Sequence, residues 1–237
     1  MSGHNKWSQI KHKKAKEDSK RGKAFTKLIK EITIAARTGG GDPAGNPRLR
    51  LLVEKAKEIN MPLDNTMRAI KRGTGELPGV NYEAMNYEGY GPHGIAVLIE
   101  TLTDNKNRTI AEIRHLFSSF GGNVAESGAV GWMFERMGVI HAHGPLSEDE
   151  LLDNLLAYDI RDIKKNDDEI VIYTDIKSLE SVKEALKKLS VTIENAEIES
   201  VAQNTTHLPE AQAEKAYEFL SELEDHDDVQ NVYTNLA

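Results

Sequence analysis

A cluster of cationic side chains near the beginning of the chain is the pattern in this sequence that most strongly indicates chemistry. Nine Lys and Arg residues lie between residues 11 and 30, and the only acidic residues among them are Glu17 and Asp18. Such a concentration of positive charge can displace the counterions that surround a phosphate backbone. A single basic helix is commonly just a solvated surface. The length of this cluster, and Trp7 beside it as a ring for stacking, favour nucleic acid as the partner.

Basic residues recur farther along the chain and extend this candidate interface. Arg48, Arg50, Lys71 and Arg72 lie on segments with helical periodicity. Arg108 lies at a strand-to-helix turn, where it could contact a phosphate, although a helix cap alone is enough to explain that turn. The residues predicted to contact nucleic acid are Lys6, Trp7, Lys11, His12, Lys13, Lys14, Lys16, Lys20, Arg21, Lys23, Lys27, Arg48, Arg50, Lys71, Arg72 and Arg108.

The charge of the whole chain conceals this basic region. The 237 residues include 30 Lys and Arg and 38 Asp and Glu, which gives a net charge of −8. Residues 1–75 hold 18 basic and 7 acidic side chains, a net charge of +11, whereas residues 76–237 hold 12 and 31, a net charge of −19. The two opposite fields indicate an anionic partner for one end only, and they leave the acidic part available to a protein partner.

Patterns that resemble cofactor or metal sites lack the context that such sites require. Gly89–Gly94 matches G-x-G-x-x-G, but it leads into a strand rather than a helix, and therefore predicts a turn between strands. His141 and His143 would lie on one face of a strand without a third ligand, which predicts a solvated edge pair and no metal. The acidic residues from Glu222 to Asp228 lack the spacing of a calcium loop, and they predict a solvated helix end.

No set of acid, base and nucleophile can be assembled, so the sequence predicts no enzymatic activity and no cofactor; an enzyme with its site in a cleft between domains is the weakest alternative. The absence of Cys excludes disulfides and Cys-ligated metals. No segment approaches the roughly 18 apolar residues of a membrane span, and the first eight residues lack the apolar core of a signal peptide. We expect a soluble, cytoplasmic protein without a membrane partner. The sequence leaves its oligomeric state open.

Three amphipathic helices are predicted for the first 75 residues. Apolar side chains recur at helical spacing from Phe25 to Ala36, and again from Leu49 to Ile59. A short third helix is expected to have Asp64 as its N-cap, Met67 and Ile70 on its buried side and Gly73 as its end. Together these helices make a basic bundle.

Strand patterns begin after a Gly- and Pro-containing linker at residues 73–79. A strand is predicted at 95–102, a helix opening at the capping-box spacing of Thr109 and Glu112, and another strand at 129–134. Residues 139–201 then give the order βαββαβ, which is typical of a ferredoxin-like domain. A helix after Pro209 and a strand at 229–234 are too little to form a sheet alone, so they must join an earlier one.

These elements predict an α+β multidomain fold, in which an N-terminal three-helix basic bundle precedes two α+β, ferredoxin-like domains. The basic helical domain covers residues 1–75, and one α+β domain is formed by residues 80–135 and 205–237. The other α+β domain, at residues 136–204, is inserted into it.

Several short segments of the sequence resemble the YebC/PmpR family, and the resemblance covers nearly the whole chain. A set of this length in one order is highly specific. The segments are Gly3–Trp7, Ile10–Lys11, Arg21–Lys23, Phe25–Lys27, Gly39–Pro43, Asn46–Arg50, Asn60–Pro62, Ala69–Gly73, Tyr87–Pro92, Thr103–Thr109 and Asp227–Gln230.

The resemblance implies three domains, a basic helical bundle and two α+β domains, with no catalytic residue to carry over. Family members are generally described as probable transcriptional regulators that bind DNA. Mitochondrial relatives resemble translational activators of cytochrome c oxidase subunit I, and bacterial relatives are linked to the ribosome and to relief of stalling at proline-rich sequences. Two hypotheses follow: a DNA-binding transcriptional regulator that uses the basic end, and a ribosome-associated translation factor that binds ribosomal RNA through the same surface.

Overall fold

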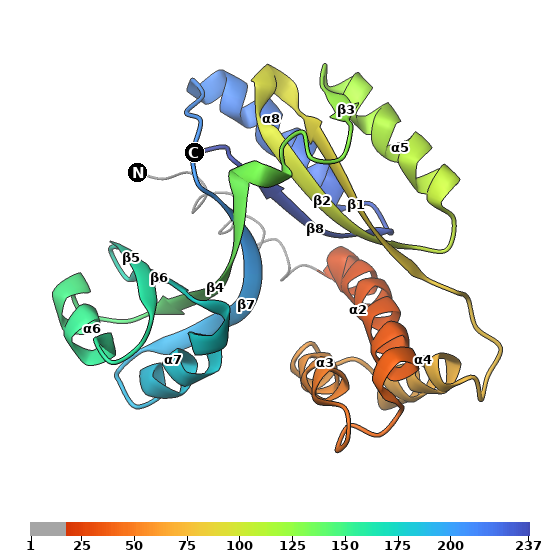
Figure 1. Ribbon diagram of the computed structural model, residues 1–237, viewed down its shortest axis with the longest axis horizontal. Helices are drawn as coiled ribbons and strands as arrows, with labels where there is room; N and C mark the ends of the chain where they lie inside the picture. The colour runs from red at the N-terminus through yellow and green to blue at the C-terminus, as the bar shows by residue number, and fades with distance from the viewer. Residues whose placement is uncertain (1–17) are drawn as a thin grey trace. The chain divides into compact units, whose positions relative to one another are not determined.

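The computed structural model of this chain describes residues 18–237 and forms two compact units (Figure 1). The first unit contains the chain up to Gly131 together with residues 206–237, and the second contains residues 132–205. The predicted nucleic-acid contacts from Lys6 to Lys16 lie outside the described residues. No helix in the described part of the chain is long and apolar enough to cross a membrane.

Three helices open the first unit, as the apolar periodicity predicts. They are α2 (Asp18–Gly39), α3 (Pro47–Glu58) and α4 (Leu63–Thr74), and both α3 and α4 pack against α2 (Figure 1). Asn46 joins two of them, because its side chain accepts the Leu49 N–H at the start of α3 and donates to the carbonyl of Ala35 in α2. The core of this helical region includes Leu28, Ile32, Ala36, Leu49, Leu52, Ala69 and Ile70.

The third helix differs from its predicted form at both ends and on its buried side. α4 begins at Leu63 behind Pro62, so Asp64 is not its N-cap, and it continues through Gly73 to Thr74. Gly73 belongs inside the helix because α4 crosses α2 very closely there: a Cβ on Gly73 would stand 2.4 Å from the carbonyl oxygen of Thr33. Of the two residues that the apolar pattern places on the buried side, Ile70 is buried, whereas Met67 is exposed to solvent.

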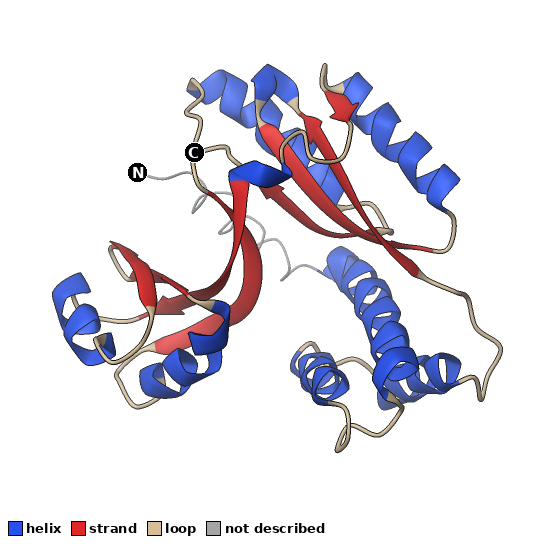
Figure 2. Ribbon diagram, in the orientation of Figure 1, coloured by secondary structure: helices blue, strands red, loops and turns tan. Residues whose placement is uncertain are grey.

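A four-stranded sheet with two helices on one face forms the rest of the first unit (Figure 2). Phe117 and Phe219 join the two helices, with ring centroids 4.9 Å apart in an edge-to-face contact. The final strand pairs with the sheet, which confirms that the end of the chain joins an earlier sheet. The elements are β1 (Glu83–Tyr90), β2 (Ala96–Thr103), α5 (Lys106–Ser119), β3 (Asn123–Ala125), α8 (Glu210–Glu224) and β8 (Val229–Thr234).

The turn at Gly89–Gly94 is confirmed as a connection between strands and not a nucleotide-binding loop. It joins the antiparallel pair β1 and β2 through a short 3₁₀ helix at Pro92–Gly94, in which His93 and Gly94 have positive φ. Gly89 and Gly91 are needed for packing, because a Cβ at either position would stand 2.6 or 2.7 Å from the ring of Phe117 or Phe219 respectively.

The strand predicted at residues 129–134 does not form, and Glu88 explains why. Its carboxylate accepts the backbone N–H groups of Gly128, Val130 and Gly131, at 2.8, 2.7 and 2.7 Å. Those N–H groups are therefore unavailable to a sheet ladder. Burial alone would raise the pKa of Glu88, but these three hydrogen bonds outweigh it and lower the pKa. A bend and a 3₁₀ turn at Gly131–Met133 result, and the strand begins only at Phe134.

The second unit is a ferredoxin-like βαββαβ domain, as predicted. Its sheet has the spatial order β5-β6-β4-β7 with every neighbouring pair antiparallel, and its two helices cover one face (Figure 2). The first sheet has the same arrangement of four strands in space, in the order β3-β1-β2-β8. The chain order differs, because β1, which lies between β3 and β2, precedes β2 in the sequence, whereas β6, at the same place in the second sheet, follows β4. The elements are β4 (Phe134–His143), α6 (Glu148–Leu155), β5 (Ile160–Asn166), β6 (Glu169–Thr174), α7 (Leu179–Leu186) and β7 (Thr192–Ala202).

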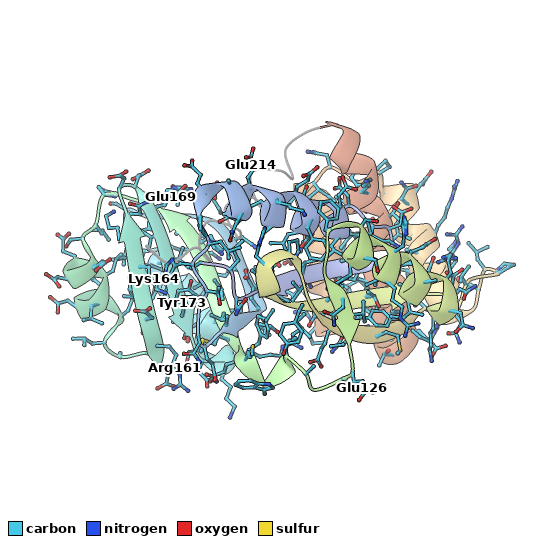
Figure 3. All side chains as sticks on the ribbon, turned by 90° about the horizontal axis from the view of Figure 1, so that it is seen from above. Glu126, Arg161, Lys164, Glu169, Tyr173 and Glu214 are labelled. Carbon is cyan, nitrogen blue, oxygen red and sulfur yellow. The ribbon has the colours of Figure 1, made fainter. Side chains whose placement is uncertain are left out.

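The two histidines of β4 are not the solvated edge pair that the sequence predicts. β4 is a central strand between β6 and β7, and the side chain of His141 is buried with its Nε2 3.7 Å from Glu199. The same face of the sheet carries Tyr173, whose ring lies 5.0 Å from the Nζ of Lys164 on the neighbouring strand (Figure 3). Strand order is decided by tertiary pairing, so an isolated His-x-His pattern cannot reveal it.

Candidate nucleic-acid interface

A row of lysines on α2 faces the acidic turn between α8 and β8. Lys23, Lys27 and Lys30 are spaced i, i+4 and i+7, which places them on one side of the helix. The Lys23 ammonium is 3.7 Å from Asp225, and the Lys27 ammonium donates to the backbone carbonyl of Glu224 at 2.8 Å. We call these three residues the lysine row.

Asp228 is the centre of this contact. It is 3% exposed, and its two carboxylate oxygens accept from the Lys30 ammonium at 2.6 Å, the Thr109 hydroxyl at 2.7 Å and the Arg108 guanidinium at 2.8 Å. Thr103 donates to it as well, at 3.2 Å. Burial alone would raise the pKa of Asp228, but the hydrogen bonds from Lys30, Arg108 and Thr109 outweigh burial and hold the pKa far below the ordinary value.

This arrangement corrects the prediction that residues 222–228 form a solvated helix end. Besides the Asp228 contacts, the Glu224 carboxylate accepts the backbone N–H of Val232 at 3.0 Å. The acidic residues follow one another closely, so they resemble a solvated charge run in the sequence. The tight turn between α8 and β8 instead brings Glu224, Asp225 and Asp228 against a helix that lies almost 200 residues earlier in the chain, whereas Glu222 and Asp227 stay exposed.

Arg108 and Thr109 have structural partners at the start of α5. The helix begins at Lys106 with Asn105 as its N-cap, whose side chain accepts the Arg108 N–H at 3.1 Å. A helix cap at this turn is therefore confirmed, with Asn105 as the capping residue, whereas Thr109 is not the residue that opens the helix. The Arg108 guanidinium binds Asp104 as well as Asp228, both at 2.8 Å. Hydrogen bonds to Asp228 and then Asp104 raise the pKa of Arg108.

A cleft of about 1050 Å³ lies between α2, α5 and the α8–β8 turn. Among the described residues, Glu112, His226 and Asp228 of this cleft form the one group whose spacing could suit a metal ion. The hydrogen bonds argue against that use. His226 Nδ1 accepts the Asp228 N–H at 3.1 Å, so a neutral ring carries its proton on Nε2, which lies 2.9 Å from Glu112. The cleft lining mixes cations with carboxylates, which does not favour a polyanion.

Other cations of the helical region remain exposed. Arg48 lies on α3, and Arg68, Lys71 and Arg72 lie on α4, all with exposed side chains. Within the described residues, none of these four side chains forms an ion pair. Arg50 differs, because its guanidinium donates to the carbonyls of Pro43 and Ala44 and so holds the loop before α3.

The predicted contacts thus fall into distinct environments. Lys20 and Arg21 lie in the first turn of α2, whose side chains are outside the described set. Lys23, Lys27 and Arg108 meet acidic partners within the protein, and Arg48, Lys71 and Arg72 face solvent. Sequence reasoning missed Asp228 as the partner of the basic helix. It also missed the exposure of Leu63 and Met67 beside the α4 cations.

Known proteins are similar to this chain along its whole length. Residues 5–76 match the TACO1/YebC protein N-terminal domain, and residues 82–236 match the TACO1/YebC second and third domain. Proteins named as probable transcriptional regulatory proteins are 53% identical over 238 residues in Chlorobaculum tepidum and 54% identical over 238 residues in Chloroherpeton thalassium. In each case the alignment covers 100% of this chain and 95% of the relative.

A solved structure gives the same result for the fold. The crystal structure of a conserved hypothetical protein from Aquifex aeolicus has a TM-score of 0.84 and 47% identity, and the match covers 98% of this chain and 96% of that one. At such identity the likeness extends beyond the fold. The N-terminal domain of the family and its second and third domain match in that order along the chain, and together they cover nearly all of it. This protein therefore belongs to the TACO1/YebC family.

Proposed function

We propose that this protein is a DNA-binding regulator of transcription that holds duplex phosphates with the exposed cations of its helical region. The described part of this interface is Arg48, Lys71 and Arg72, and Lys20, Arg21 and the basic segment from Lys6 to Lys16 extend it. Lys23, Lys27 and Arg108 are left out of the proposed contact, because carboxylates of the same molecule already neutralise them.

The observation that carries the proposal is the separation of charge, +11 over residues 1–75 and −19 over the remainder. Arg48 on α3 and Arg68, Lys71 and Arg72 on α4 keep this positive field at the surface, since the described residues provide these four with no ion pair. Such side chains release counterions on binding a phosphate backbone, which drives binding without regard to sequence. The names of the relatives support a role in transcription.

The test is a salt titration of binding to a random-sequence 30-base-pair duplex, followed by fluorescence anisotropy. The variant Lys71→Gln/Arg72→Gln removes two charges from α4. We expect its slope of log affinity against log salt to be shallower by about 1.8, since each lost duplex contact removes about 0.9. The matched control, Lys183→Gln/Lys187→Gln in α7 and at its C-cap, removes the same charge from cations that pair with Glu180 and Glu184. That control should keep the wild-type slope.

Competition separates duplex DNA from the ribosome as the target. Unlabelled ribosomal RNA and whole ribosomes are added to the labelled complex at physiological salt, and a selection from a random duplex library seeks a preferred sequence. Enrichment of one sequence, and its resistance to ribosomal RNA, are expected for a transcriptional regulator. If ribosomes displace every duplex at lower concentration, the DNA proposal fails and the ribosome-associated alternative takes its place.

We propose further that the two compact units contain three domains: the helical domain and one α+β domain in the first unit, and the other α+β domain in the second. The acidic α+β domains are free to meet a protein partner. The helical domain at 1–75 is connected to the next domain by residues 76–80, all of which are exposed. Limited proteolysis should therefore cut first near Glu76–Val80. Protection of that segment throughout digestion would contradict a separate helical domain.

A further inference from the structure

The solvent side of α4 combines two large apolar side chains with a row of cations. Leu63 is 67% exposed and Met67 is 45% exposed, and the two lie one helical turn apart. Arg68, Lys71 and Arg72 follow on the adjoining part of the same exposed side. We call these five residues the α4 face.

Packing fixes this orientation of α4. The opposite side of the helix is buried through Thr66, Ala69 and Ile70. Gly73 lies against the backbone of α2, where a Cβ would stand 2.7 Å from the Cβ of Ala36. Rotation of α4 to bury Leu63 and Met67 would bring Arg68 and Lys71 toward the apolar core and would break this close approach. The exposed apolar pair is consequently a fixed property of the folded helical region.

Single exposed apolar residues are common on protein surfaces and need no explanation. Here two of them adjoin on one helix, and each leaves apolar surface in contact with water that burial would remove. Arg68, Lys71 and Arg72 beside them exclude an ordinary apolar partner at that edge and attract a polyanion. A surface that is apolar in one row and cationic in the next matches nucleic acid, whose bases are apolar on their faces and whose backbone is anionic.

We propose that the α4 face is a wedge for duplex DNA. Leu63 and Met67 enter the minor groove and pack against an opened base step, while Arg68, Lys71 and Arg72 bind the adjoining phosphates. Leu and Met are among the side chains that such wedges use, and partial unstacking kinks the duplex toward its major groove. The inference rests on the proposed DNA-binding function and assigns its apolar contact.

The experiment uses the full-length protein and a 30-base-pair duplex that contains 2-aminopurine, whose fluorescence rises when a base step opens. The wild type should raise this fluorescence on binding. Leu63→Ala/Met67→Ala should abolish the rise and weaken binding about tenfold, the effect of losing ~1.4 kcal/mol, with an unchanged salt slope. Arg68→Gln/Lys71→Gln should instead make the slope shallower by about 1.8.

A matched control exists on α6. Leu152 and Leu156 have the same i, i+4 spacing and are 48% and 70% exposed, but they lie in the second unit. Leu152→Ala/Leu156→Ala should leave both the fluorescence rise and the affinity at wild-type values. Circular dichroism and the thermal midpoint verify folding, and neither should change, because all four side chains are exposed.

The outcomes separate the two proposals. If the wild type binds duplex and the Leu63→Ala/Met67→Ala variant keeps its affinity and fluorescence rise, the wedge is wrong and DNA binding stands. If the wild type binds no duplex, the proposed function fails and the wedge with it. Loss of a protein partner by the Leu63→Ala/Met67→Ala variant, with DNA binding intact, would also overturn the wedge and would assign the α4 face to protein docking.

Discussion

The lysine row of α2 and the α4 face each contain three cations at helical spacing, yet the fold gives these cations opposite environments. Lys30 is 6% exposed and bound to Asp228, whereas Lys71 is exposed and forms no ion pair with the described residues. Both regions contribute to the basic character of the first 75 residues. A cation's role therefore follows from the surface that it meets, and only the second region keeps its charge available to an external anion.

The two regions are therefore expected to contribute to different properties, the lysine row to stability and the α4 face to binding. A buried Lys or Asp is costly unless it is paired and hydrogen-bonded, and Asp228 meets that condition through four donors from α2, β2 and α5. An exposed Lys keeps its hydration and contributes little to folding. We therefore expect substitutions in the lysine row to change the free energy of unfolding, and substitutions on the α4 face to change affinity for phosphate.

The largest expected effect follows from Asp228→Asn. This change leaves Lys30 buried without its carboxylate and removes a partner from Arg108, so the free energy of unfolding should fall by about 3–5 kcal/mol. Urea denaturation followed by circular dichroism measures it. The control Asp153→Asn, an exposed acid on α6, should change the free energy by no more than about 0.5 kcal/mol.

The pH dependence of this variant identifies the cause. Because the pKa of Asp228 is lower in the folded protein than in the unfolded chain, its contribution is complete above about pH 4 and is lost as the pH falls further. The difference between wild type and Asp228→Asn should accordingly shrink below that pH. If the difference stays constant down to pH 3, Asp228→Asn destabilises the protein by a packing defect. The ion pair with Lys30 would then not be the source of the stability that distinguishes the lysine row from the α4 face.

A second, smaller effect tests the position of α4 without changing its charges. Gly73→Ala places a Cβ against α2 and should cost about 1–3 kcal/mol in thermal unfolding, because overpacking forces the two helices apart. Gly22→Ala in α2 meets no atom within 4 Å, and it should stabilise the protein by about 1 kcal/mol through helix propensity. Equal effects at the two glycines would mean that α4 does not depend on this close crossing.

The smallest effect tests the two basic regions directly. Lys27→Gln should lower the free energy of unfolding by about 1 kcal/mol, since Lys27 binds Glu224 in a mostly buried pair, and it should leave the salt slope of DNA binding unchanged. Lys71→Gln should do the reverse, with a slope shallower by about 0.9. Lys23→Gln, whose pair with Asp225 is more exposed, should cost only about 0.2–1 kcal/mol. A shallower slope for Lys27→Gln would show that DNA displaces the acidic turn.

Local patterns predicted most of the elements correctly. The apolar periodicity of α2 and α3 and the βαββαβ order of the second unit each depend on neighbouring residues, so the sequence is sufficient to predict them. Two of the failures share one cause. Glu88 prevents a strand at residues 129–134, and Gly73 continues a helix that it was expected to end, because contacts from distant parts of the chain decide both.

For the candidate interface, the sequence by itself determined the residue types, the helical spacing of the cations and the separation of +11 from −19. Those properties depend only on covalent order and helix geometry. The tertiary structure alone decided which cations meet a carboxylate and which face solvent, because Lys30 and Asp228 are 198 residues apart and are joined only when α2 packs beside the α8–β8 turn. It also turned Leu63 and Met67 outward, since burial depends on the face a helix presents to its neighbour.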